Sequence, residues 1–377
     1  MTDLFKRYCL PGLVFQSVII GGGYGTGREI AEFFLSHGAI GGLMGMALAA
    51  LCWGVVLAIA FEFARMTKGY NYRTFFEALL GPFWPAFEIL YLLISLLVLS
   101  VLGSAAGEMI SETFGLPRLA GTMTLLCAVG ALAYWGSKTI ERALTFWSII
   151  LYTVYGAFFV WVVLQFGDDI SVAFGRSEVR GAWHLDGLRY AAYNLVALAA
   201  ILFVLPYLDS RGTALKAGFF AGALGIIPGV FVFLAMLSQY PGVEQDPVPV
   251  LSVLKALNAF WFFIVFQIVL FGTFIETGAG IVHAVNERVA GVFAEKGRNF
   301  PHWARLIIAL SLLGGAIFLA ASIGIIELIA KGYGALSYGF IAIVVAPLLT
   351  IGVYRIITTK SPFAEGSSNS RQAKSGA

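Results

Sequence analysis

The sequence contains little charge and few of the side chains that bind metals or form disulfides. Charged residues make up 12% of its 377 residues, whereas soluble domains carry roughly 25%. The three cysteines, Cys9, Cys52 and Cys127, form neither a CxxC motif nor a paired framework, and the four histidines do not cluster. The formal net charge of +3 is too small to indicate a nucleic-acid partner. These shortages exclude a soluble domain and indicate neither a disulfide framework nor a metal site.

Hydrophobic residues dominate instead, at 59% of the chain with a mean hydropathy of +0.86. A membrane-spanning helix needs about 20 consecutive, mainly apolar residues. Windows of this kind occupy residues 10–35, 40–64, 85–112, 118–136, 141–166, 187–208, 213–239, 257–285, 304–323 and 328–357. The sequence therefore predicts an all-α integral membrane protein with ten transmembrane helices.

The order of the spans and the distribution of charge predict the topology. Most of the 24 Lys and Arg residues fall on the side of the N-terminus, which indicates a multi-pass protein of the bacterial inner membrane with both termini in the cytoplasm. Ten spans divide into two sets of five, residues 1–166 and 187–357, and an odd number in each half predicts an inverted repeat. Residues 67–84 are expected to form an interfacial helix, residues 167–186 a polar connection, and residues 358–377 a disordered cytoplasmic tail.

The first span contains five glycines within residues 21–27, followed directly by Arg28 and Glu29. Exposed backbone and charges are costly in hydrocarbon, so this pattern predicts a helix that is broken near mid-depth and binds a ligand there. A short helix from Thr26 would direct its amide end at a carboxylate, and the carbonyls near Gly21 would face a cation. The alternative is close helix packing through Gly-xxx-Gly spacing. The substrate-binding candidates in this run are Gly22, Gly23, Tyr24, Gly25, Thr26 and Gly27.

Arg28 and Glu29 allow two interpretations. They could contact the substrate, or they could form an outer gate that pairs with other helices when the vestibule closes. The gate is favoured for Arg28, and Glu29 is grouped with it although its sequence context does not decide between the two.

Two further spans contain polar residues that could reach a substrate. Glu108 shares one helical face of the third span with Ser104 and Ser111, so it could bind an amine or carry a proton, or could be an outer-surface carboxylate. In the sixth span, Asn194 could hydrogen-bond a substrate and Tyr193 could cap it, although tyrosines near an interface often belong to the aromatic belt.

The eighth span has a polar stripe on an otherwise apolar helix, and Thr273, Glu276 and Thr277 lie on it. Hydroxyls around a carboxylate suit Na⁺, which prefers hard oxygen donors, and a carboxylate in such a place could also carry a proton. These residues, together with Gly21, are the predicted coupling-ion site. The alternative is a glutamate that only fixes neighbouring helices through hydrogen bonds.

The segment Gly22-Gly23-Tyr24-Gly25-Thr26-Gly27-Arg28-Glu29, followed by Phe33-Phe34, resembles the glycine-rich signature of the YkvI-type membrane proteins. In a ten-span protein it also resembles the amino acid–polyamine–organocation superfamily. That resemblance implies the LeuT-type five-plus-five inverted repeat, with discontinuous first and sixth helices. It implies a substrate between spans one, three, six and eight, and a cation between spans one and eight. The pair Glu276-Thr277 stands where sodium-coupled members have paired small hydroxyls, so both Na⁺ and H⁺ remain open.

The sequence therefore predicts a cation-coupled secondary transporter of a small zwitterion, such as an amino acid or a related amine. It contains no HExxH and no GxSxG motif, so an enzyme is not indicated. The predicted partners are a small solute and membrane lipid, with no nucleic acid and no cofactor beyond the coupling ion. The alternatives are a carrier of a nucleobase or a quaternary amine, and a membrane sensor that does not transport.

Overall fold

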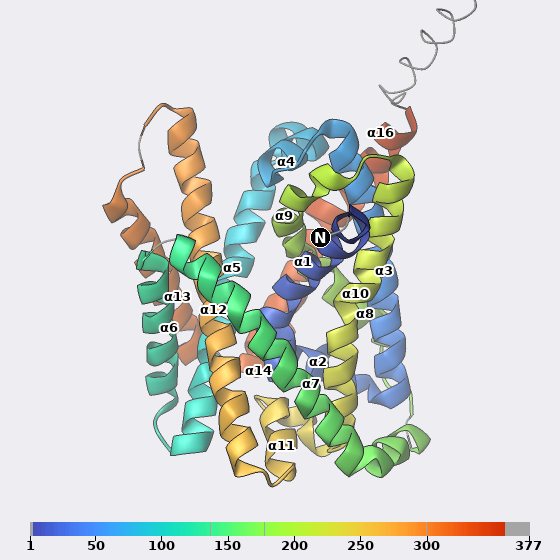
Figure 1. Ribbon diagram of the computed structural model, residues 1–377, viewed down its shortest axis with the longest axis vertical. Coiled ribbons are helices and arrows are strands. Elements are labelled where there is room, and N and C mark those ends of the chain that lie inside the picture. The colour runs from blue at the N-terminus through green and yellow to red at the C-terminus, as the bar shows by residue number, and fades with distance from the viewer. Residues whose placement is uncertain (1–2, 136, 177, 299, 359–377) are drawn as a thin grey trace, which may run out of the picture.

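The computed structural model describes residues 3–135, 137–176, 178–298 and 300–358, and helices account for most of them (Figure 1). This described part of the chain contains no strand. The α-helices are α1 (Leu10–Ile19), α2 (Arg28–Phe33), α3 (Gly38–Thr67), α4 (Tyr72–Leu80), α5 (Pro85–Phe114), α6 (Arg118–Trp135), α7 (Ser137–Gly175), α8 (Trp183–Asn194), α9 (Leu198–Ile201), α10 (Arg211–Leu237), α11 (Pro249–Ala256), α12 (Phe260–Glu295), α13 (His302–Ser322), α14 (Ile325–Glu327), α15 (Gly334–Phe340) and α16 (Val353–Thr358).

Shorter 3-10 and π-helical turns extend or link these helices. The π turns are η1 (Phe5–Cys9), η2 (Ile20–Tyr24), η8 (Leu328–Tyr333), η9 (Ile341–Val345) and η10 (Leu348–Gly352). The 3-10 turns are η3 (Leu35–His37), η4 (Gly81–Phe83), η5 (Leu195–Ala197), η6 (Leu202–Tyr207) and η7 (Gly242–Gln245). The predicted tail, residues 358–377, lies outside the described residues from position 359 onward.

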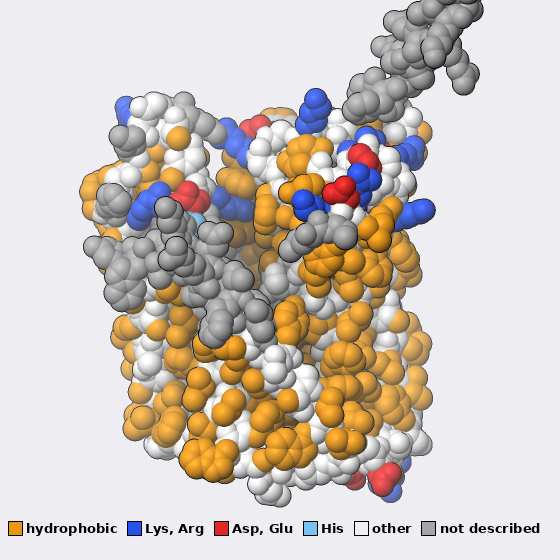
Figure 2. All heavy atoms as spheres, viewed as in Figure 1, with side chains coloured by type: hydrophobic (Ala, Val, Ile, Leu, Met, Phe, Trp, Pro, Cys, Tyr) orange, Lys and Arg blue, Asp and Glu red, His pale blue; other side chains and the backbone are white. Residues whose placement is uncertain are grey.

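Eight helical segments of the described chain are long and apolar enough to cross a membrane. They are Arg28–Thr67, Pro85–Phe114, Ile150–Gly175, Trp183–Tyr207, Arg211–Leu237, Phe260–Ala294, Trp303–Ser322 and Ile325–Thr358. The predicted window 10–35 corresponds to α1, η2 and α2, and the window 118–136 corresponds to α6, whose described apolar part is Arg118–Leu132. Hydrophobic side chains cover most of the lower and middle surface in Figure 2, and charged ones gather toward its upper end. The protein is therefore a multi-pass membrane protein.

The first predicted span is interrupted by the glycine run, although not at Thr26. The helix continues through η2, and the next helix, α2, begins at Arg28 after Gly27, whose φ of +75° lies in the left-handed region. A side chain is strained at such a φ, so glycine is the residue that fits the turn. The short helix, predicted to begin near Thr26, thus begins two residues later, at Arg28.

The connection predicted for residues 167–186 is much shorter than expected. Helix α7 continues through a kink at Phe166 (φ −124°, ψ 22°) to Gly175, and α8 already begins at Trp183. The acidic pair Asp168-Asp169 therefore lies on a helix rather than in a loop. The predicted interfacial helix between residues 67 and 84 is present as α4, whose Phe75, Phe76 and Leu79 are buried.

Small residues bring two long helices, α3 and α10, into backbone contact. A Cβ added at Gly218 would lie 2.4 Å from the backbone nitrogen of Ala58, and one added at Gly222 would lie 2.3 Å from that of Gly54. Such close approach is typical of helix packing in membranes, where small residues at the interface replace a hydrophobic driving force. The resulting pair forms one wall beside α1 and α8 (Figure 1).

Candidate functional site

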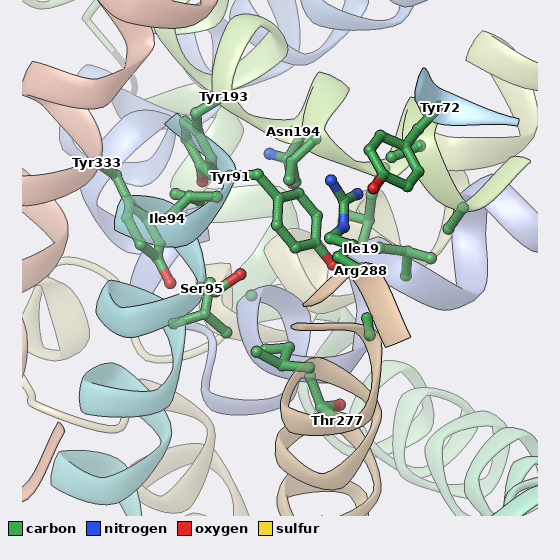
Figure 3. Close-up of a pocket in the computed structure, with 18 of the residues that line it drawn as sticks. Ile19, Tyr72, Tyr91, Ile94, Ser95, Tyr193, Asn194, Thr277, Arg288 and Tyr333 are labelled. Carbon is green, nitrogen blue, oxygen red and sulfur yellow. The ribbon is translucent and has the colours of Figure 1, made fainter. Parts of the chain in front are cut away.

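A cavity of about 360 Å³ lies at the interruption of the first span, between α1, α5, α8 and α12. Figure 3 shows side chains from these helices converging on it, with Tyr193 and Asn194 from α8, Tyr91 and Ser95 from α5, and Thr277 from α12. Cavities of this size, with a few polar groups among apolar ones, are the usual form of small-molecule sites.

Glu29 contributes a carboxylate to this cavity. It lies in the first turn of α2, is 4% exposed, and accepts a hydrogen bond of 2.5 Å from the hydroxyl of Tyr193. Gly23 makes room for it, since a Cβ at Gly23 would lie 2.6 Å from Glu29 Oε2. No salt bridge joins Glu29 to a basic side chain among the described residues. The prediction placed Glu29 with the gate, whereas the structure places it in the cavity.

Aromatic rings form the wall next to Glu29. The ring centroids of Tyr193 and Tyr333 are 4.7 Å apart and the rings are tilted by 33°. Asn194 also lines the cavity, and its side-chain amide donates to the carbonyl of Tyr190. Sequence reasoning identified Tyr193 and Asn194 as site residues but did not select Tyr333.

The other end of the cavity contains an arginine that sequence reasoning did not select. The guanidinium of Arg288 lies 3.7 Å from the ring centroid of Tyr72 and 3.5 Å from that of Tyr91 (Figure 3). Its Nη1 donates to both carboxylate oxygens of Glu88 at 3.1 Å. Burial, and then the nearby Glu88 carboxylate, raise the pKa of Tyr72 to about 12, so its phenol is neutral at physiological pH. The signal that could have revealed this cluster is a basic residue directly after Glu287 on a polar helix face.

Arg288, Glu88, Tyr72 and Tyr91 together are called the Arg288 cluster. This cluster also separates the central cavity from a second cavity of about 660 Å³ beside α4. Three residues, Tyr72, Glu287 and Arg288, line both cavities. Glu287 itself is paired with Arg305 at 2.7 Å. The cluster is thus a partition between the central cavity and the α4 end of the molecule.

The four predicted coupling-ion residues line one small cavity of about 40 Å³ next to the central one. Gly21 lies against Thr277, since a Cβ at Gly21 would be 2.2 Å from Thr277 Oγ1. The hydroxyl of Thr273 donates to the carbonyl of Val269 and accepts from Trp147 Nε1 at 3.2 Å. Thr277 lines both this cavity and the central one, so the two are adjacent. Glu276 supplies the carboxylate of the small cavity.

Several predicted substrate-binding residues do not line the central cavity. The hydroxyl of Tyr24 donates to the carbonyl of Gly225, and its ring packs against Gly229 on α10. The carbonyl of Gly25 accepts from the hydroxyl of Tyr155. Gly22 lies in η2, and its surroundings are outside what the structure describes. The prediction that Tyr24 shapes the pocket is therefore wrong, because its side chain packs against α10 and hydrogen-bonds to it instead of lining the cavity.

Thr26 and Gly27 do not reach the central cavity either. The hydroxyl of Thr26 accepts a hydrogen bond from the amide of Arg28 at 3.1 Å, so this first amide of α2 already has a partner. Gly27 faces Met236 and Val250. Neither residue occurs among the described residues that line the central cavity, so the structure does not bring these two predicted substrate-binding residues to it.

Glu108 is a buried carboxylate, 6% exposed, that pairs with an exposed arginine. Its Oε2 accepts from Arg118 Nε at 3.0 Å, and the Arg118 side chain is 69% exposed. Glu108 does not occur among the residues that line the central cavity. The structure therefore does not bring it to the predicted substrate site, and it also differs from an outer-surface carboxylate because its own side chain is buried.

Arg28 connects α2 to the loop in front of α11. Its Nη1 donates to the carbonyls of Glu244 at 2.6 Å and Asp246 at 2.9 Å, and its Nη2 donates to Glu32 Oε2 at 3.0 Å. The side chain is 3% exposed. These bonds join the start of α2, which carries Glu29, to the loop before α11.

The fold and the cavity define a multi-pass membrane protein with an internal cavity of the size that small molecules occupy. No protein-family model matches the chain. The chain is 23% identical to the uncharacterized membrane protein YkvI of Bacillus subtilis (strain 168), over 89% of this chain and 93% of that protein. It is also 23% identical to the uncharacterized protein YyaD of the same organism, over 80% of this chain and 85% of YyaD. Two mutants of the Eremococcus coleocola manganese transporter share the fold, with a TM-score of 0.51 and 15% identity over 92% of this chain and 78% of theirs.

Proposed function

We propose that this protein is a cation-coupled secondary transporter of a small solute that carries an amino group, either an amino acid or a related amine. The observation that carries the proposal is Glu29, a buried carboxylate that faces the central cavity at the interruption of the first span. A buried charge of this kind needs a proton or a cation beside it, and in membrane proteins it marks a substrate or ion pathway.

The proposed architecture is the five-plus-five inverted repeat. In it, α1, η2 and α2 are the discontinuous first helix, and α8, η5, α9 and η6 are the sixth. Helix α6 is counted as the fourth span. The contact between α3 and α10, the second and seventh spans, supports this assignment because equivalent helices of the two halves then lie side by side. The substrate lies where the discontinuous helices open.

The coupling ion is proposed to bind in the small cavity formed by Gly21, Thr273, Glu276 and Thr277. Its oxygen ligands suit Na⁺, and Glu276 could instead carry H⁺. The structural relatives are manganese transporters, but the described residues of this protein contain no group of three or more His, Cys, Asp or Glu side chains that could hold a metal ion. An organic solute therefore suits the site better.

The α4 side, where basic residues gather, and both termini are proposed to face the cytoplasm of a bacterial cell; the excess of Lys and Arg on that side supports this orientation. In this orientation the Arg28 contacts close the outer side. The central cavity approaches the cytoplasm and is separated from it by the Arg288 cluster.

Flux measurements test the proposal. We expect purified protein in proteoliposomes to accumulate radiolabelled amines or amino acids when a Na⁺ or a pH gradient is imposed, and to lose this accumulation in Glu276→Gln. Glu112→Gln is the matched control, because Glu112 pairs with Lys255 at the surface. Binding without flux would identify a sensor, and uptake of uracil or adenine in place of amines would identify a nucleobase carrier.

A further inference from the structure

We infer that the solute is an organic monocation without a carboxylate group, that is, a primary or quaternary ammonium compound rather than an amino acid. This inference rests on the proposed function and names the substrate class of the same cavity. It depends on which charges the cavity offers, and on which of them are already neutralised.

The negative charge of Glu29 is available to a ligand. Tyr193 donates to one of its oxygens, and no basic side chain in the described chain forms a salt bridge with it. A hydrogen bond from a phenol does not neutralise a buried carboxylate, so the site gains most from a cation next to Glu29. An ammonium group meets this requirement.

No positive charge of the cavity is equally available. Arg288 is the one basic residue among the described residues that line it. Its Nη1 is bonded to both oxygens of Glu88, and tyrosine rings lie against the guanidinium at 3.7 and 3.5 Å. A solute carboxylate would have to compete with Glu88 for this guanidinium.

The backbone at the start of α2 offers little compensation. The first amide of α2 is bonded to Thr26, and Gly27 faces Met236 and Val250 rather than the cavity. A carboxylate that entered the cavity would meet hydroxyls such as those of Ser95 and Tyr333, but no basic side chain among the described residues that is free of another carboxylate, and it would lie near the like charge of Glu29. Both effects disfavour an amino acid.

The Arg288 cluster shows that this cavity already binds an organic cation, namely one of its own side chains. Two tyrosine rings and the carboxylate of Glu88 surround that cation. The end of the cavity at Glu29 has the same combination of groups, because the rings of Tyr193 and Tyr333 lie next to the carboxylate of Glu29. Aromatic faces attract cations through the ring quadrupole, and they suit quaternary ammonium groups in particular. The volume of about 360 Å³ limits the solute to a small amine.

Matched pairs of ligands test the inference. Binding of choline against glycine betaine, and of tyramine against tyrosine, is measured by calorimetry on the purified full-length protein. We expect the member without a carboxylate to bind at least about tenfold more tightly in at least one pair. We also expect Glu29→Gln to abolish this binding, and Glu112→Gln to leave it unchanged. If Glu29→Gln does not fold, the preference of the unmodified protein within each pair still gives the answer.

The outcomes separate the inference from the proposed function. If glycine betaine or tyrosine binds as tightly as its partner, the inference is overturned, whereas gradient-driven flux of that amino acid would leave the transporter proposal standing. If an amine binds with the expected preference but no gradient drives its flux, the inference holds and the transporter proposal fails. If neither pair binds, the inference is overturned together with the amine part of the proposed function.

Discussion

The Tyr193 hydroxyl and the Glu29 carboxylate are joined by a hydrogen bond of 2.5 Å that links α8 to α2 inside the membrane. Each residue lies beside a helix interruption, since Gly27 precedes α2 and the 3-10 turn η5 follows α8. The bond therefore couples the two irregular segments that line the central cavity, and it orients the carboxylate toward that cavity.

Removing this hydroxyl tests its role. In Tyr193→Phe we expect solute binding to weaken by about tenfold or more, because a hydrogen bond to a charged group contributes roughly 1.5–3 kcal/mol. Tyr338→Phe is the matched control, since the hydroxyl of Tyr338 contacts Arg189 at the exposed surface. Calorimetric titration of both variants measures the change. Equal affinities in the two variants would show that Tyr193 does not position Glu29 for binding.

The contact of Gly21 with Thr277 gives a second prediction. In Gly21→Ala the new methyl group would lie 2.2 Å from Thr277 Oγ1, so we expect a destabilisation of about 1–3 kcal/mol and a loss of ion-coupled uptake. Gly280→Ala on the same stripe of α12 has no atom within 4 Å of the added Cβ and serves as the control.

The double variant Gly21→Ala with Thr277→Ala separates packing from ion binding. It removes the clashing hydroxyl, so thermal stability should partly return, whereas ion-coupled uptake should not. Recovery of uptake in the double variant would show that the Thr277 hydroxyl is not an ion ligand.

The sequence was sufficient to predict where helices lie and which of them carry polar groups. Long apolar windows and the glycine run depend on local composition, and these local features predicted an all-helical membrane protein with an irregular first span. The sequence predicted that the fifth span ends at Phe166, and it missed the continuation of the helix beyond the kink there, because the acidic pair Asp168-Asp169 that follows has the composition of a polar loop.

The roles of individual site residues were harder to predict, because they depend on which neighbour each side chain meets in space. Glu108 and Glu29 look alike in the sequence, as acidic residues near small ones. Both are buried, but one is paired with Arg118, whereas the other accepts a hydrogen bond from Tyr193 and lines the central cavity. The role of Arg288 could not be predicted from the sequence, because its partners Tyr72, Glu88 and Tyr91 are about 200 positions away in the chain.

Arg28 is expected to stabilise the closed end of the cavity. Arg28→Met removes hydrogen bonds to the carbonyls of Glu244 and Asp246, and the unfolding free energy should fall by about 2–5 kcal/mol because buried bonds to a charged group are lost. Lys331→Met is the control, because its pair with Glu327 is exposed and should contribute only about 0–1 kcal/mol. Thermal unfolding in detergent measures both. If the unfolding temperature falls by a similar small amount in both variants, Arg28 does not stabilise this end of the protein.

The partition formed by Arg288 is expected to control access to the cavity from the α4 side. Arg288→Gln removes the ion pair with Glu88 and the cation between Tyr72 and Tyr91, so the partition should open more often. A cysteine placed at Ser95, which lines the central cavity, reports this opening when Cys9, Cys52 and Cys127 are replaced.

We expect a membrane-impermeant thiol reagent, added from the α4 side, to label that cysteine about tenfold faster in Arg288→Gln, which corresponds to roughly 1.4 kcal/mol less stabilisation of the closed partition. Arg305→Gln is the control, because Arg305 pairs with Glu287 at the exposed rim and not with the rings. If Arg288→Gln and Arg305→Gln are labelled at the same rate, the guanidinium between the two tyrosines is not the barrier, and the route into the cavity must be sought elsewhere.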